Sequence, residues 1–134
     1  MLRSPRKARG LLCRRGAMKP EILEYLKRLK KLRYLFHTDR EGRIVAHCLD
    51  FDVVASALDR EEASRRLDVL VRLRITLALI NGDASQLAHE APRDYVEMYE
   101  RGKAIGTHLV DCLIPLIAKK QEFSVVAVEL ACAA

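Results

Sequence analysis

Residues 34–63 read YLFHTDREGRIVAHCLDFDVVASALDREEA, and this stretch decides the fold. Apolar residues alternate with polar ones on either side of Asp39-Arg40-Glu41-Gly42, a polar turn whose glycine can take the positive φ that closes a hairpin. Asp50-Phe51-Asp52 then forms a second short kink. The stretch therefore predicts an antiparallel meander of three short strands, covering about residues 33–38, 43–49 and 53–57.

The strongest helix signal follows the third strand. Asp59 can cap the helix, Glu62 stands three residues later as in a capping box, and Asn81-Gly82 supplies a stop. The helix has about twenty residues, a length of about 30 Å. It ends in the nearly all-apolar run Ile75–Ile80, which predicts cover by a second element or subunit. One apolar stripe is expected from Leu67, Leu70, Val71, Leu77 and Ala78.

Further elements are expected before and after these strands and this helix in the sequence. Residues 20–32 read as an amphipathic helix whose polar face carries Lys27, Arg28, Lys30 and Lys31. A further helix is expected from Pro92 to near Gly102, residues 109–114 fit either a strand or a helix, and the valine-rich residues 123–130 predict another strand. The expected fold class is α+β: a small antiparallel sheet against a long helix, with an N-terminal basic helix.

Charge divides the chain into two parts. Residues 1–33 hold twelve Lys or Arg against two acidic residues, whereas residues 34–134 hold twelve against sixteen. Residues 1–17 thus read either as a basic, disordered arm or as an upstream extension before a true start at Met18. Residues 18–134 are expected to form a single domain with an insertion near 83–120.

Composition excludes several classes of protein. Half of the 134 residues are hydrophobic, which suffices for one core without disulfides or metals. There is no apolar run of the roughly 18 residues that a membrane-spanning helix needs, and the basic start lacks a signal-peptide core. The four cysteines show no pairing rhythm, so reduced thiols and a cytoplasmic location are expected.

Residues 34 to about 81 resemble the HicB-like antitoxin family. The hairpin ending in Gly42, the run from Ile44 to Ser56 and the helix start Asp59-Arg60-Glu61-Glu62-Ala63 carry this resemblance, and Val125–Leu130 would match the family's last strand. Two departures are Leu49, where proline is usual, and Ala57, where glycine usually precedes the helix. The C-terminal DNA-binding domain common in operator-binding members is also missing.

The resemblance implies a β-β-β-α-β domain that binds and neutralises HicA, a small basic ribonuclease toxin. Residues 34–134 hold more acidic than basic residues, and this charge independently favours a basic partner. Many soluble proteins, however, have an acidic surface that is simply solvated. Partner-facing candidates are Asp50, Phe51, Asp52 and Ser56. We expect no enzymatic activity, no cofactor and self-association through the sheet edge or the apolar end of the long helix.

Two groups of residues could suggest a metal site, but neither has the spacing that such a site needs. Asp50 and Asp52 with Glu61-Glu62 could hold divalent ions, but they serve equally well as turn and capping residues. His37, His47 and Cys48 do not supply the four convergent ligands that zinc needs, so no metal site is expected. Two alternatives to the antitoxin remain: a nucleic-acid-binding module using Lys27, Arg28, Lys30 and Lys31, and an orphan HicB-like protein with a scaffold role.

Overall fold

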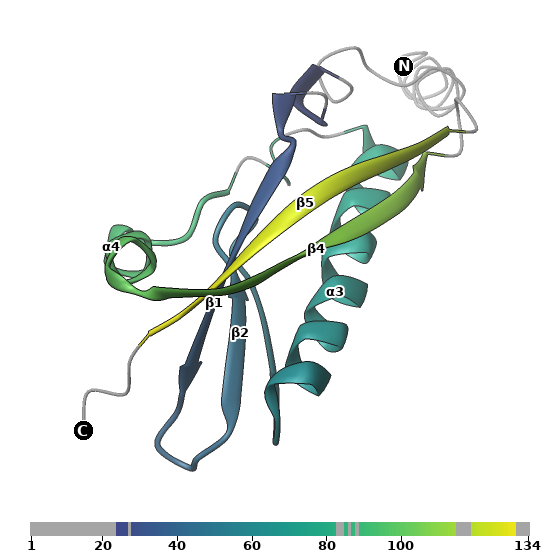
Figure 1. The fold of residues 1–134 in the computed structure, drawn as a ribbon. Coiled ribbons are helices and arrows are strands. Elements are labelled where there is room, and N and C mark those ends of the chain that lie inside the picture. The colour runs from purple at the N-terminus through teal and green to yellow at the C-terminus, as the bar shows by residue number, and fades with distance from the viewer. Residues whose placement is uncertain are drawn as a thin grey trace, which may run out of the picture.

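The structure, a computed structural model, describes residues 24–26, 28–82, 85, 87, 89–114 and 119–130. Within these ranges, five strands, a helix of 22 residues and a helix of nine residues make an α+β fold (Figure 1). None of the helices in these ranges is long and apolar enough to cross a membrane. In chain order the elements are β1 (Lys31–Thr38), β2 (Ile44–Cys48), β3 (Val53–Ala57), α3 (Arg60–Asn81), α4 (Arg93–Arg101), β4 (Lys103–Ile114) and β5 (Lys119–Glu129).

The expected meander is confirmed. β1 pairs antiparallel with β2, and β2 pairs antiparallel with β3. In the first turn Gly42 has φ 82°, and the carboxylate of Asp39 accepts from the backbone N–H groups of Glu41 and Arg43, both at 2.9 Å. In the second turn Asp52 itself takes the positive φ of 56°.

The sheet is mixed, so the prediction of an antiparallel sheet is wrong at its centre. Its strand order is β3-β2-β1-β5-β4, and β5 runs parallel to β1. β4 pairs only with β5, antiparallel, and residues 109–114 therefore form a strand. A parallel neighbour requires a long crossover, which α3, α4 and β4 provide here.

Helices cover both faces of the sheet (Figure 1). α3 packs on the face that carries Tyr34 and Phe36 and closes the main core, while α4 covers part of the opposite face around Leu35, Leu49 and Val128. α4 begins after Pro92 and ends at Gly102, as expected. The insertion thus covers part of the second face of the sheet.

The ends of α3 are confirmed and its expected stripe is wrong in part. Asp59 accepts from the Glu62 backbone N–H at 2.8 Å, and Gly82, with φ 63°, donates to the last carbonyls. Leu70 is only half-buried and Leu77 is exposed. The core is filled instead by side chains at a slightly rotated set of positions: Ala63, Leu67, Val71, Ile75, Ala78 and Leu79.

The predicted helix over residues 20–32 extends too far. Glu24–Leu26 and Arg28 are helical, but Lys31 and Leu32 already belong to β1. Leu32 is buried beneath α3 in the main core, and this burial in the sheet outweighs the helical spacing of the leucines. The first part of the predicted helix and the arm over residues 1–17 lie outside the described residues.

Candidate functional site

Asp50 lies in the turn between β2 and β3, and its carboxylate accepts hydrogen bonds from Arg33 of the same chain. One oxygen accepts from the Arg33 backbone N–H at 2.8 Å, and the other accepts from the Arg33 guanidinium at 2.9 Å. Arg33 also binds Glu90, in the segment before α4, at 2.5 Å. Although burial opposes the charged form, the hydrogen bonds from Arg33 to Glu90 and Asp50 raise the pKa of the guanidinium. Arg33 on β1 therefore links the turn between β2 and β3 to the segment that leads into α4.

Phe51 does not face a partner, contrary to expectation. Its side chain is fully buried in the main core beneath α3, because a large aromatic ring at this tight turn gains most by leaving water. Ser56 lies on β3, at one edge of the sheet, where its backbone carbonyl accepts from Arg66 at 2.8 Å. Of the four predicted residues, Asp50, Asp52 and Ser56 are partly exposed, but the carboxylate of Asp50 is bound by Arg33.

Asp52 belongs to a small cluster under α4. It binds Nε2 of the buried His47 at 2.8 Å. The Tyr95 ring of α4 meets His47 edge-on at 4.7 Å between centroids and stacks with His37 at 6.4 Å. Burial and the neighbouring His47 lower the pKa of His37. These contacts fasten α4 to the meander.

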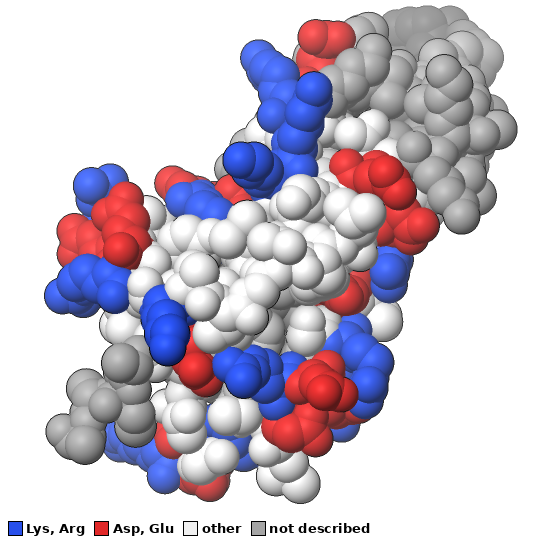
Figure 2. Space-filling model, viewed as in Figure 1, with Lys and Arg blue, Asp and Glu red and all other residues white. Residues whose placement is uncertain are grey.

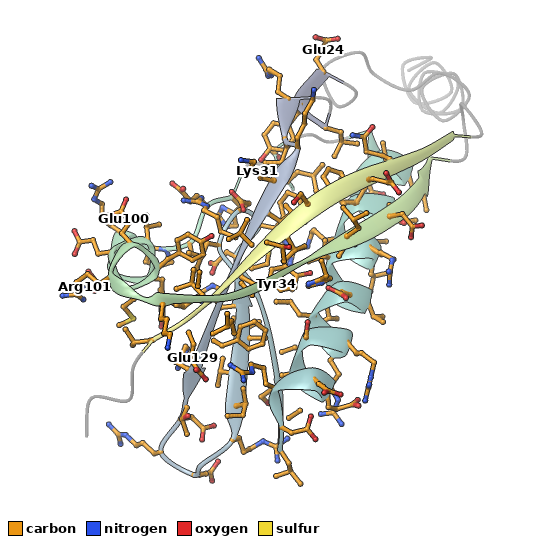
Figure 3. All side chains as sticks on the ribbon, viewed as in Figure 1. Glu24, Lys31, Tyr34, Glu100, Arg101 and Glu129 are labelled. Atoms are coloured by element: carbon orange, nitrogen blue, oxygen red, sulfur yellow. The ribbon has the colours of Figure 1, made fainter. Side chains whose placement is uncertain are left out.

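A second polar cluster lies between α3 and the sheet. Tyr34, at the centre of the molecule (Figure 3), donates to Asp68 at 2.7 Å, and Nε2 of His108 lies 3.0 Å from the same oxygen. Burial raises the pKa of the Tyr34 hydroxyl. The hydroxyl thus stays protonated and serves as a hydrogen-bond donor inside the core.

The described residues give little support for a reactive cysteine or a metal site. Cys48 is buried, and burial raises the pKa of its thiol to about 12, so it behaves as a small apolar core residue. No group of three or more His, Cys, Asp or Glu among the described residues could hold a metal ion. Cys13 and Cys132 lie outside the described residues.

A surface with few charged residues lies over β4 and β5. Figure 2 shows charged side chains interleaved around the margin and a broad uncharged area over these two strands. β4 is an edge strand, and its residues 104–110 contain no charged side chain. On the face opposite α3, Leu109 is 63 % exposed and pairs with Ser124, next to the pair Thr107 and Val126. We call these four residues with the open β4 edge the β4 surface.

Two carboxylates border the β4 surface. Asp111 and Glu122 are directly opposite each other on β4 and β5. Two like charges in such a cross-strand pair normally destabilise the sheet. Glu122 is exposed, and Arg72 lies 4.0 Å from Asp111. The sequence could have indicated this surface through the alternation of residues 107–112, had that segment been recognised as a strand.

Three of the four basic residues of the nucleic-acid alternative lie at the start of β1 or just before it. Arg28, Lys30 and Lys31 are all exposed, and Figure 3 shows Lys31 at the start of β1. Lys27 lies outside the described residues. Exposure of these three residues is compatible with a solvated face as well as with phosphate contacts.

Comparison of the chain with protein-family models, with curated proteins and with solved structures finds no match.

Proposed function

We propose that this protein is a non-enzymatic, HicB-like antitoxin that binds and neutralises a small basic ribonuclease toxin of the HicA kind. The order of its elements supports this proposal. A three-stranded meander leads into the long helix α3, and the later strand β5 returns beside β1. This is the β-β-β-α-β order that the sequence resemblance implies, with α4 and β4 inserted before the last strand.

The observation that carries the proposal is the β4 surface. An open edge strand offers unpaired backbone groups to a strand of another protein, and an exposed leucine beside them offers apolar contact. The acidic pair Asp111 and Glu122 at its border favours a basic partner, because a cation placed between the two carboxylates relieves their repulsion. Asp52 and Ser56, two of the four residues predicted from sequence, lie towards the opposite edge, on β3 and the turn before it.

The proposal is tested with the full chain as bait in a lysate of the source cells. Bound proteins are identified by mass spectrometry, and RNA cleavage by the purified partner is measured with and without this protein. We expect a stoichiometric, basic partner whose cleavage stops when this protein is added. A lysate that yields no such ribonuclease contradicts the antitoxin function.

A matched pair of variants locates the interface. Leu109→Lys places a charge on the β4 surface, whereas Val54→Lys places one at a comparably exposed position, 50 %, on the opposite edge strand β3. We expect Leu109→Lys to weaken inhibition about tenfold or more and Val54→Lys to leave it unchanged. The reverse result would move the interface to β3, Asp52 and Ser56.

Charge reversal tests the acidic border separately. Glu122→Lys leaves Leu109 and the strand edge in place, so it should chiefly slow association and reduce its dependence on salt. An association rate that is unchanged at low salt argues against an electrostatic contribution from this pair.

The exposed basic residues support one competing function, binding to nucleic acid. Arg28, Lys30 and Lys31 lie close together in sequence and all face solvent. This function predicts binding that weakens steeply with salt and is lost in the triple variant with Ala at these positions. Neutralisation of the toxin should survive that variant.

A further inference from the structure

The outer face of α3 changes character along its length. Its first turns carry Glu62, which pairs with both Arg65 and Arg66. From residue 69 onwards the residues that point away from the sheet are apolar, and they remain exposed. They are Val69, Leu73, Leu77 and Ile80, with exposed fractions of 59 %, 50 %, 43 % and 57 %. We call these four residues the α3 stripe.

The two arginines in this half of α3, Arg72 and Arg74, bind backbone groups on either side of the helix and do not cover the α3 stripe. Arg72 donates to the backbone carbonyl of Asp111 on β4 at 2.9 Å. Arg74 donates to the backbone carbonyl of Phe51 on the other side of the helix, at 3.4 Å. Both arginines thus bind the sheet and leave four large apolar side chains together in water, an arrangement that marks an interaction surface.

We propose that the α3 stripe is the contact between two copies of this chain, whose α3 helices pack antiparallel across a twofold axis. The spacing favours a helix as the occupant. Val69, Leu73 and Leu77 follow one another at steps of four residues, and such a row of side chains forms a ridge that packs into the groove of a neighbouring helix.

The position of the stripe favours a second copy in the antiparallel direction. Because the stripe occupies only the second half of α3, an antiparallel pair can place Val69 opposite Ile80 of the second copy and Leu73 opposite Leu77. The charged first turns then extend beyond the contact. A parallel pair would instead set Arg66 against Arg66 of the second copy, at a cost in like-charge repulsion.

The size of the stripe predicts a reversible dimer. The apolar segment from residue 69 to residue 80 is about 16 Å long. A contact of this length buries less than the roughly 800 Å² per partner of a standard stable interface. The dimer should therefore dissociate on dilution. Because the stripe points away from the sheet, the contact leaves the face of the sheet that carries Leu109 open.

The test is sedimentation velocity of the full chain over a range of concentrations. We expect a concentration-dependent dimer, and Leu73→Lys should raise its dissociation constant about tenfold or more. Val54→Lys is the matched control, since Val54 is as exposed as Leu73, at 50 %, but lies on β3, and it should leave the dimer unchanged. A chain that stays monomeric at every concentration, or a Leu73→Lys variant that dimerises like the wild type, overturns the proposal.

A complementation experiment tests the direction of the helices. Val69→Lys and Ile80→Glu should each weaken the dimer, and their thermal unfolding shows that each variant folds. Mixed in equal amounts, they should form a heterodimer, because the antiparallel register places the new lysine opposite the new glutamate. If both variants fold and their mixture remains monomeric, the antiparallel register is wrong.

Discussion

At the scale of single residues, three arginines of α3 bind backbone carbonyls at both edges of the sheet. Arg66 binds Ser56 on β3, Arg74 binds Phe51 in the turn before β3, and Arg72 binds Asp111 on β4. Edge strands carry unpaired backbone groups that invite pairing with other chains, and charged side chains near an edge limit it. The five residues of β3 are better covered in this way than the twelve of β4, so β4 is the edge more open to a partner.

Asp59 should stabilise α3 measurably. Its carboxylate satisfies one backbone N–H of the first turn, and replacing such a cap with alanine costs about 1 kcal/mol. We expect Asp59→Ala to lower the free energy of unfolding by that amount in urea titration. Asp59→Asn, which keeps the accepting oxygen, should retain most of the stability, and an equal loss in both variants would assign the effect to charge rather than to capping.

His37 should make the protein less stable in mild acid. Because burial and His47 lower its pKa in the folded state, the unfolded chain binds this proton first as the pH falls. The stability that neutral His37 contributes is complete above the unfolded pKa of about 6.5 and is lost as the pH falls from there through the folded pKa.

This pH dependence is measured from the thermal midpoint of unfolding between pH 7.5 and pH 5. In His37→Gln the decline of the midpoint should be shallower than in the wild type, whereas in His89→Gln, at an exposed position, it should match the wild type. A His37→Gln variant with an unchanged decline would assign the pH dependence to other groups.

At the scale of elements, the sequence predicts best what is determined locally. The turn at Asp39–Gly42, the cap at Asp59 and the stop at Gly82 depend on neighbouring residues, and all three are confirmed. The rotation of α3 about its axis is not local, because it depends on where the sheet lies. The sequence pattern placed Leu70 and Leu77 inward, whereas the sheet contacts Leu67, Val71 and Ile75.

Truncation of two leucines of α3 measures that rotation. Leu67 is fully buried and Leu70 only half-buried at the margin of the core. Leu67→Ala should lower the free energy of unfolding by about 2–5 kcal/mol, and Leu70→Ala by clearly less. Both values come from urea titration at one pH. Equal losses, or a larger loss for Leu70→Ala, would mean that α3 is rotated from its position here.

At the scale of the whole molecule, the features that sequence missed arise from distant segments. The parallel pairing of β1 with β5 joins residues 31–36 to residues 124–129, and no local pattern announces it. The pairing also explains why Lys31 and Leu32 leave the helical pattern, since β5 gives them a strand neighbour. The β4 surface was missed for the same reason: its four side chains come together only when β4 and β5 pair.

Removal of β5 should prevent the domain from folding rather than leave a smaller folded domain. β5 lies between β1 and β4, and Phe123 and Val125 are fully buried in the main core. A chain ending at residue 114 should therefore lose cooperative thermal unfolding, as measured by circular dichroism. Removal of residues 1–17 serves as the comparison, and we expect it to preserve the transition. A cooperative transition in the chain that ends at residue 114 would show that the meander and α3 are stable alone.

The place of β5 in the sheet also has a consequence for synthesis on the ribosome. β1, β2, β3 and α3 emerge early, yet the strand that completes their core is made after all of them. Until then the nascent chain exposes apolar side chains and an unpaired strand, the condition in which chaperones and proteases engage a protein. The cellular level of this protein should depend on how quickly its last strand is translated.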